Sequence, residues 1–192
     1  SDNTLGVYFN ETTYGAVVRS NLIESNNRPG FNTSMGIYAD MAPETFVVDK
    51  NKFTGHATAA IRLNTSGQVS TKITNNQFVN DSSIILIRDT GPIIRGNTIT
   101  GANSDAILFN WGVDGARLSC NTIENSAGSA LRLEGASVGT DLHFKDNNIQ
   151  GNLFGLRLDT AAYDTSGGRL DARNNWWGSE TGPDFVQGGN PG

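Results

Sequence analysis

The chain is poor in the residues that mark several common protein classes. Of its 192 residues one is cysteine, Cys120, two are methionine and five are proline. A single cysteine excludes an internal disulfide framework. No apolar run approaches the roughly 20 residues that a spanning helix needs, so we expect no membrane span. The start at Ser1 lacks the basic and apolar stretches of a signal peptide, which indicates a processed or excised piece of a longer protein.

Charged residues are also few. They make up 17% of the chain, and 14 Lys and Arg against 19 Asp and Glu give a formal net charge of −5. No run of Lys or Arg occurs, and phosphate binding needs a basic patch, so we expect no nucleic-acid partner. The abundant residues are instead 23 glycines and 22 asparagines. Both are weak helix formers that serve well in turns, and the composition predicts a fold with many tight turns.

Asparagine recurs with a period of 21 to 30 residues through the whole chain. Each of the seven repeats has a large apolar residue two positions later, and six of the seven have another three positions earlier. The repeating positions are Asn21, Asn51, Asn76, Asn97, Asn121, Asn147 and Asn175. Because such a period is typical of stacked repeats, the sequence predicts a solenoid.

Each repeat also contains an earlier pair of apolar residues two positions apart, such as Ile61 and Leu63 or Ile85 and Ile87. Spacing of two is the period of a strand with one buried face. The sequence therefore predicts an all-β parallel β-helix of about seven rungs, with three short strands in each rung. At the bend between the second and third strands, we expect the repeating asparagine to adopt a left-handed backbone and to bond the asparagine of the next rung.

The repeats resemble those of the right-handed parallel β-helix proteins, the pectate-lyase-like superfamily, and in particular bacterial repeats of the form VxxNxI. Residues 93–103, IIRGNTITGAN, and 116–126, ARLSCNTIENS, carry this resemblance. Residues 172–183, ARNNWWGSETGP, resemble an NWWGS-x-x-GP element of secreted bacterial members. The resemblance implies an extracellular, cell-surface or periplasmic location. It leaves the activity open, because the superfamily contains lyases, hydrolases, epimerases and adhesins.

The outward side chains of the first strand of each rung form the predicted binding face. We assign this column to Tyr8, Tyr38, Arg62, Leu86, Leu108, Arg132 and Arg157, followed two residues later by a column that includes Arg88, Glu134 and Asp159. Aromatic rings stack on sugars, and arginine forks bind carboxylates. The glycan-binding candidates are Tyr8, Tyr38, Arg62, Arg88, Trp111 and Trp176. A solvated sheet with ordinary surface ion pairs is the competing interpretation.

Catalysis on an acidic glycan needs a base and a group that neutralises the substrate carboxylate, or two or more converging carboxylates. The candidates are Arg132, Arg157, Glu134 and Asp159. We predict no cofactor. Calcium is the one exception considered, because acidic residues gather near the end of the chain at Asp159, Asp164, Asp171, Glu180 and Asp184, although no DxDxDG spacing occurs there.

The first predicted strand, at residues 6–9, follows only five residues, so the first rung has an open edge. Either the chain is the C-terminal part of a longer β-helix, or this end associates with another subunit. We expect one domain at 1–187 and a tail at 188–192. Three functions remain open: a structural, adhesive or polysaccharide-binding domain of the cell surface, an enzyme acting on acidic glycans, or a filament subunit.

Overall fold

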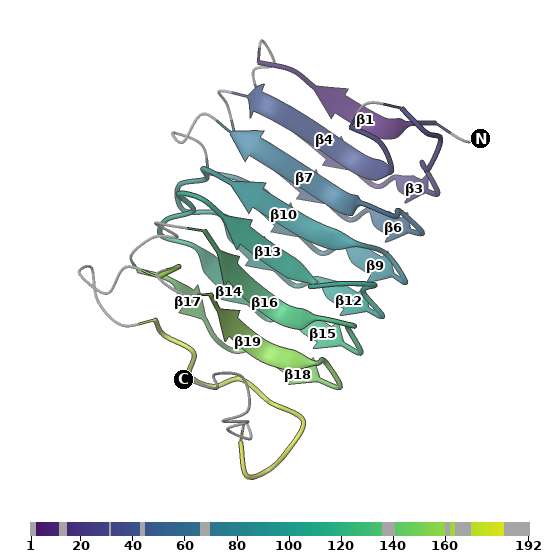
Figure 1. Cartoon of the computed structure of the whole chain (residues 1–192). Coiled ribbons are helices and arrows are strands. Elements are labelled where there is room, and N and C mark those ends of the chain that lie inside the picture. Colours follow the sequence, from purple (N-terminus) through teal and green to yellow (C-terminus); the bar gives the residue numbers. More distant parts are fainter. Residues whose placement is uncertain are drawn as a thin grey trace.

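The computed structural model describes residues 3–11, 15–30, 32–42, 45–65, 70–135, 141–159, 162–163 and 170–182. Within these ranges every regular element is a strand, and the strands wind into a parallel β-helix with β1 and β19 at opposite ends (Figure 1). The described residues contain no helix that could cross a membrane. The predicted all-β fold is confirmed.

Three parallel sheets form the walls of the helix, and consecutive strands belong to different sheets. Sheet A contains β1 (Leu5–Phe9), β4 (Met35–Ala42), β7 (Ala59–Thr65), β10 (Ser83–Ile87), β13 (Ile107–Asn110), β16 (Ser129–Glu134) and β19 (Phe154–Leu158). Sheet B contains β2 (Ala16–Arg19), β5 (Phe46–Asp49), β8 (Lys72–Thr74), β11 (Ile93–Arg95), β14 (Arg117–Ser119) and β17 (His143–Phe144). Sheet C contains β3 (Leu22–Glu24), β6 (Lys52–Thr54), β9 (Gln77–Val79), β12 (Thr98–Thr100), β15 (Thr122–Glu124) and β18 (Asn148–Gln150).

Six rungs are complete, because the described strands number seven in sheet A and six in each of sheets B and C. After β19 the described residues continue the stack through isolated bridges of His143 with Asp171 and of Asn148 with Trp176. Three strands per rung is therefore confirmed, whereas seven rungs is slightly more than the structure shows. The last repeat has Ala172 where the six earlier repeats have a large apolar residue, so it buries less surface in sheet B.

Apolar side chains stack from rung to rung to form the core. The residues three positions before the ladder asparagines, such as Ile73, Ile94 and Leu118, have no exposed surface. Two positions after the ladder asparagines, Phe53, Phe78, Ile99 and Ile123 are at most 1% exposed, and the rings of Phe53 and Phe78 stack with centroids 4.8 Å apart. Each rung thus buries its apolar face against its two neighbours.

One predicted apolar pair is displaced by a single residue. In β10 the inward residues are Ile84 and Leu86, which pair with Ile61 and Leu63 of β7, whereas Ile85 faces outward beside Arg62. The assignment of Ile85 and Ile87 to the interior is therefore wrong. Because residues 84–87 are all apolar, alternation could not show which of them face the core, and a slip of one residue exchanges the two faces.

The predicted asparagine ladder joins all seven repeats, from Asn21 to Asn175. The backbone N–H and the Nδ2 group of each asparagine donate to Oδ1 of the next, with N···O distances of 2.9–3.1 Å throughout. The Nδ2 group also donates to a strand carbonyl of the preceding rung, as from Asn97 to Ile73 at 2.8 Å. The ladder therefore satisfies buried backbone groups that the turn would otherwise leave unpaired.

The left-handed backbone belongs to the residue before each ladder asparagine. These residues are Ser20, Lys50, Asn75, Gly96, Cys120, Asp146 and Asn174, with φ between 56° and 66°. The prediction that the ladder asparagines themselves adopt this conformation is wrong. Their side chains must align with the helix axis to bond one another, so the preceding residue makes the bend. Cys120 is one of these exposed corner residues.

The two ends of the helix differ. At the C-terminal end the indole of Trp177 packs edge-on against Phe144, with ring centroids 6.2 Å apart. Gly155 makes room for it, since a Cβ there would lie 2.6 Å from the indole. At the other end the first rung surrounds a hollow of about 350 Å³, lined by Val7 and Ile23 among others. The predicted tail at 188–192 lies outside the described residues, and the predicted domain bounds stay a prediction.

Candidate functional site

Arg132 is the centre of a charged cluster on the outer face of sheet A. Its guanidinium lies 2.7 Å from Asp159, 3.1 Å from Glu134 and 3.4 Å from Asp105. Arg157 of the next strand donates from Nε to Asp159 Oδ1 at 3.1 Å. The structure thus brings the four predicted catalytic candidates together and adds Asp105. That residue precedes β13 in a loop, outside every apolar column, so the repeat pattern offered no signal for it.

These ion pairs determine how the cluster can act chemically. The hydrogen bond from Arg132 holds the pKa of Asp159 below its usual 3.8, and the same bond raises the pKa of Arg132. Asp159 therefore stays ionised at neutral pH, with one oxygen bound to Arg132 and the other to Arg157. A general acid needs a pKa near the working pH, so this carboxylate is suited to binding and to holding strands together rather than to proton transfer.

The outward column of sheet A differs from the predicted one at its centre. The strand register aligns Tyr8, Tyr38, Arg62, Ile85, Leu108, Arg132 and Arg157. Ile85 replaces Leu86, which points inward. In the next column Ile87 stands where Arg88 was expected, because Ile87 pairs with Asn64 and Asn110. Arg88 therefore lies at the corner after β10.

Tyr8 and Tyr38 stack with ring centroids 5.6 Å apart and an interplanar angle of 15°. Tyr8 is 55% exposed, whereas Tyr38 is 7% exposed and its hydroxyl accepts a hydrogen bond from Asn32 at 3.2 Å. Burial raises the pKa of Tyr38, with Asp40 adding to the effect. Tyr38 and the half-buried Arg62 therefore belong to the outward column but expose little of their surface. Of the two tyrosines, only Tyr8 is largely exposed.

Met41, Arg88 and Trp111 form what we call the corner ridge, at the bend where the chain leaves sheet A. All three adopt a left-handed backbone, with φ of 51°, 57° and 54°. The Arg88 backbone N–H donates to the Trp111 carbonyl at 2.8 Å, and Arg88 Nη1 lies 3.3 Å from Met41 Sδ. Trp111 is 58% exposed and Met41 41%. A hollow of about 330 Å³, lined by Tyr8 and Asp40 among others, adjoins Met41.

Gly135 positions the indole of Trp111. A Cβ at Gly135 would lie 3.0 Å from both Cδ1 and Nε1 of the indole, so the ring lies directly against the backbone of the next rung. Gly135 also has φ of 86°, which other residues rarely adopt. One edge of Trp111 is thus held in place while more than half of the residue stays exposed.

Trp176 lies apart from the other glycan-binding candidates. It bridges with Asn148 of β18 in sheet C, beyond the last complete rung, and it is 44% exposed. The other five candidates belong to sheet A or to the bend that follows it. Trp176 therefore cannot contribute to one short binding surface with them.

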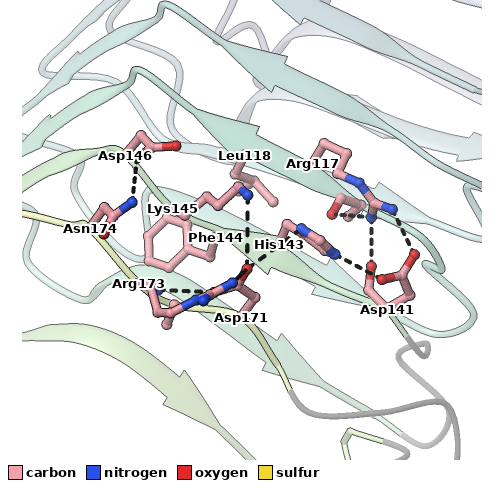
Figure 2. A network of polar contacts seen from close by, with 12 residues as sticks. Arg117, Leu118, Asp141, His143, Phe144, Lys145, Asp146, Asp171, Arg173 and Asn174 are labelled. Atoms are coloured by element: carbon pink, nitrogen blue, oxygen red, sulfur yellow. Dashed lines mark hydrogen bonds and ion pairs between the residues drawn. The ribbon is translucent and has the colours of Figure 1, made fainter.

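A second charged network, which the sequence did not predict as a site, occupies the outer face of sheet B at its C-terminal end (Figure 2). Asp141 lies between Arg117 Nη2 at 2.6 Å and His143 Nε2 at 2.8 Å. Asp171 lies 2.8 Å from Arg173 Nε and 3.9 Å from Lys145 Nζ. The hydrogen bonds from Arg173 and from Arg117 hold the pKa values of Asp171 and Asp141 below their usual range.

Two ionisable sites are buried and face no solvent. His56 Nδ1 lies 2.8 Å from Asp81 Oδ2, and Asp81 Oδ1 accepts backbone N–H groups of His56 and Ser82 at 2.9 and 2.7 Å. Asp89 accepts the Thr71 N–H at 3.2 Å, and burial raises the pKa of Asp89 to about 6. Both sites hold bends of the chain in place rather than offering groups to a ligand.

The described residues contain no group of three or more His, Cys, Asp or Glu side chains arranged to hold a metal ion. Of the acidic residues considered for calcium, Asp159 and Asp171 are bound by arginines. Asp164 and Asp184 lie outside the described residues. The prediction that no cofactor is needed therefore stays a prediction.

Comparison with known proteins identifies a family but no individual relative. No curated protein and no solved structure matches the chain. The family described as a right-handed β-helix region matches residues 35–177, from β4 to the tryptophan that packs against the last rung. That match spans well over half of the chain, and the stacked parallel strands agree with it. The chain therefore belongs to the right-handed β-helix family.

Proposed function

We propose that this chain is a polysaccharide-binding domain of the cell exterior, at the cell surface or in the periplasm, with an adhesive or structural role. The observation that carries the proposal is Trp111, which packs against Gly135 on one side and remains 58% exposed. Soluble proteins rarely place several large apolar side chains together on the surface without a partner. Here Trp111, Met41 and Tyr8 lie along one bend and the adjoining strand.

The surroundings of the corner ridge offer the contacts that a sugar uses. An indole or phenol ring packs against the apolar face of a pyranose, and polar side chains bind its hydroxyls. Asp40, Asn10 and Glu11 line the hollow next to Tyr8 and provide hydrogen-bond acceptors. The left-handed backbone at each ridge residue fixes the direction of its side chain. A partly preordered site loses less conformational entropy on binding.

The charged cluster around Arg132 favours binding over catalysis. All three carboxylates near Arg132 lie within ion-pair distance of it, and Asp159 is bound by two arginines. A hydrolase or lyase would need one of these groups to exchange a proton with substrate. The lowered pKa of Asp159 opposes that role.

Incubation of the purified chain with a panel of neutral and acidic insoluble polysaccharides tests the proposal. We expect retention on at least one polymer with no release of reducing or unsaturated ends. Trp111→Ala should weaken retention by about tenfold, since one stacked aromatic contributes on the order of 1 kcal/mol or more. Trp176→Ala changes another exposed tryptophan, beside β18 of sheet C, and is the control that should leave retention unchanged.

Two results would overturn the proposal. Cleavage of a polymer that Arg132→Ala or Asp159→Ala abolishes would make the chain an enzyme. Retention that Trp111→Ala and Tyr8→Ala both leave intact would exclude the corner ridge as the binding surface. Circular dichroism of each variant establishes that the β-helix remains folded.

A second candidate function is self-association through the first rung. It is favoured by the hollow of about 350 Å³ at that end and by the half-buried Val7 and Phe9 beside it. The occupant we propose is the first rung of a second copy, because Trp177 covers the opposite end of the helix. Val7→Lys should then convert a dimer to a monomer in sedimentation velocity. A monomeric wild-type chain at micromolar concentration would exclude this function.

A further inference from the structure

Asp89 is a buried carboxyl group with no cation beside it. It has no exposed surface and lies in the bend at residues 88–91, which follows β10. Its Oδ1 accepts the Thr71 N–H at 3.2 Å, whereas Oδ2 has no hydrogen-bond partner among the described residues. A buried carboxylate without a counter-ion is unfavourable. The group therefore stays neutral by holding a proton, or becomes charged by gaining access to water.

The charged residues around the bend do not compensate Asp89. Arg88 precedes it, but its Nη1 lies 3.3 Å from Met41 Sδ. Lys72, at the start of the neighbouring β8, is exposed on the outer face of sheet B. Neither cation forms an ion pair with Asp89. Asp114 of the next rung is exposed and would add negative charge.

Burial therefore decides the protonation of this group. It outweighs the hydrogen bonds that Asp89 accepts and raises its pKa to about 6. The two histidines of the chain are bonded elsewhere, His56 to Asp81 and His143 to Asp141. A proton that binds at this bend near pH 6 is thus bound by Asp89.

Backbone hydrogen bonds join the bend that holds Asp89 to the corner ridge. The Arg88 N–H donates to the Trp111 carbonyl at 2.8 Å. The Asp89 carbonyl accepts the Asp114 N–H at 2.8 Å, and the Gly91 N–H donates to the Asp114 carbonyl at 2.6 Å. These bonds connect the bends of two neighbouring rungs, so a displacement of the first bend also displaces Trp111.

The bend is also the part of this rung that opens most easily. Residues 88–91 lie between β10 and β11, outside both strands, and Thr90 pairs with Asp114 through an isolated bridge. Arg88 has φ of 57°, which is unfavourable for residues other than glycine. Opening this segment would break few of the sheet hydrogen bonds that hold the rung together.

We propose that Asp89 is a proton-operated switch beneath the corner ridge. With its carboxyl group protonated, the bend is closed and holds Arg88 and Trp111 in place. With the group ionised, the bend opens towards water and the ridge loosens. The ridge should therefore bind its ligand more tightly in mildly acidic surroundings than at pH 7.5. The effect on binding rests on the proposed function, and the inference goes beyond that function by naming how the surface is regulated.

Proton linkage gives the direction and the size of the effect. An open bend would expose Asp89 to water and return its pKa to the usual 3.8, so proton binding favours the closed bend. Between pH 5 and 7.5 the ratio of open to closed bend should rise about tenfold.

Hydrogen exchange of the intact chain at pH 5, 6 and 7.5 tests the switch. Protection factors, which correct for the intrinsic exchange rate, are measured for residues 88–91 and 111–115. Fluorine NMR of the chain labelled with 5-fluorotryptophan follows Trp111. Asp89→Asn is the test variant, because an amide oxygen can still accept the backbone N–H that Oδ1 binds but does not titrate. The exposed Asp146→Asn is the control.

We expect the protection of both segments to fall about tenfold between pH 5 and 7.5 in wild type and in Asp146→Asn. The fluorine signal of Trp111 should change with a midpoint near pH 6. Asp89→Asn should keep the protection that wild type has at pH 5 throughout. Protection that is independent of pH in wild type, or that falls equally in Asp89→Asn, would overturn the proposal.

A measurement on wild type alone keeps the test independent of whether the variant folds. The ¹³C signal of the Asp89 carboxyl group reports its protonation directly. A midpoint near pH 6 supports the switch, and a midpoint near pH 4 would overturn it.

Retention on a neutral polysaccharide at pH 5 and 7.5 separates this inference from the proposed function. If wild type is retained at neither pH while exchange responds through Asp89, the switch stands and the proposed function fails. If Trp111→Ala abolishes retention but wild type is retained equally at both pH values, the corner ridge stands and the switch is excluded.

Discussion

Each ladder asparagine pairs polar groups of two neighbouring rungs at once. Asn97 accepts the backbone N–H and the Nδ2 group of Asn76 at 2.9 and 3.0 Å, and it donates to Asn121 and to the carbonyl of Ile73. It is 1% exposed, so water cannot replace these bonds. Its removal leaves several buried groups without partners, and each such group costs about 1–3 kcal/mol.

Asn97→Ala should therefore lower the free energy of unfolding by about 3 kcal/mol or more. Asn21→Ala is the matched comparison, because Asn21 is exposed in the first rung and should cost less than about 1 kcal/mol. Guanidinium denaturation followed by circular dichroism measures both. Equal losses in the two variants would show that the ladder bonds add little beyond turn propensity.

Asp89 makes stability depend on pH in the direction opposite to most carboxylates. Burial raises its pKa from 3.8 to about 6, so the folded state binds the proton more tightly than the unfolded state. The stabilisation that comes from this tighter proton binding is complete below about pH 4 and is lost as the pH rises through 6. The free energy of unfolding falls by about 3 kcal/mol over that range. Asp89→Asn removes the charge and should be more stable than wild type at pH 7.5 by about 2 kcal/mol.

The difference between Asp89→Asn and wild type should shrink as the pH falls to 4.5. Denaturation curves at pH 4.5, 6 and 7.5 measure it, and the exposed corner substitution Asp146→Asn is the control. A difference between wild type and Asp89→Asn that stays constant across this range would contradict a raised pKa at Asp89.

At the scale of elements, the strands of sheet A are joined by charge as well as by backbone hydrogen bonds. Arg132 of β16 contacts Asp105 before β13 and Asp159 after β19, so one side chain connects three rungs. Its exposed fraction is 22%, which leaves the ion pairs partly screened by water.

Arg132→Ala removes the cation from among three carboxylates and should lower the free energy of unfolding by about 1–2 kcal/mol at low salt. The loss should diminish in 1 M NaCl, where screening weakens the repulsion left among the carboxylates. Arg157→Ala, at the edge of the same cluster, should cost less. Thermal unfolding at both salt concentrations measures these effects, and a loss independent of salt would assign the role of Arg132 to packing alone.

The sequence predicted both the strands and their buried faces where apolar and polar residues alternate. Where they do not alternate, it predicted the strand but assigned the wrong face to the core. The period of the ladder asparagines predicted the strands, the ladder and the core columns around Ile73 and Ile94, because each repeat had the same pattern. In β10, four consecutive apolar residues gave no alternation to show which side faces the core. The resulting shift of one residue also placed Arg88 in the outward column, where the structure has Ile87. The charged network on the outer face of sheet B was also missed, since Arg117, His143 and Asp171 lie more than 20 residues apart and become neighbours only when the register is known.

At the scale of the whole molecule, each rung is stabilised by the rungs next to it, because every described strand of the three sheets pairs only with its neighbours in the stack. In such a one-dimensional structure the ends are the weakest parts. The aromatic contact of Trp177 with Phe144 therefore protects the last rungs, whereas the exposed Trp176 does not.

Trp177→Ala should lower the free energy of unfolding by about 3 kcal/mol and increase hydrogen exchange in β18 and β19 more than in β7 or β10. Trp176→Ala should change either quantity little. Native-state hydrogen exchange with mass spectrometry resolves the rungs. Uniform acceleration across all rungs in Trp177→Ala would contradict protection that is local to the C-terminal end.

The register of the three sheets has a mechanical consequence. All backbone hydrogen bonds between rungs, and the ladder bonds with them, run along the helix axis, so a pull along that axis stretches these bonds lengthwise and detaches the rungs one at a time. A pull across the axis, along the strands, loads the bonds of a whole rung simultaneously and in shear. The molecule should therefore resist sideways tension far better than lengthwise tension, and a force spectrometer with handles placed on opposite corners of one rung would encounter its stiff direction.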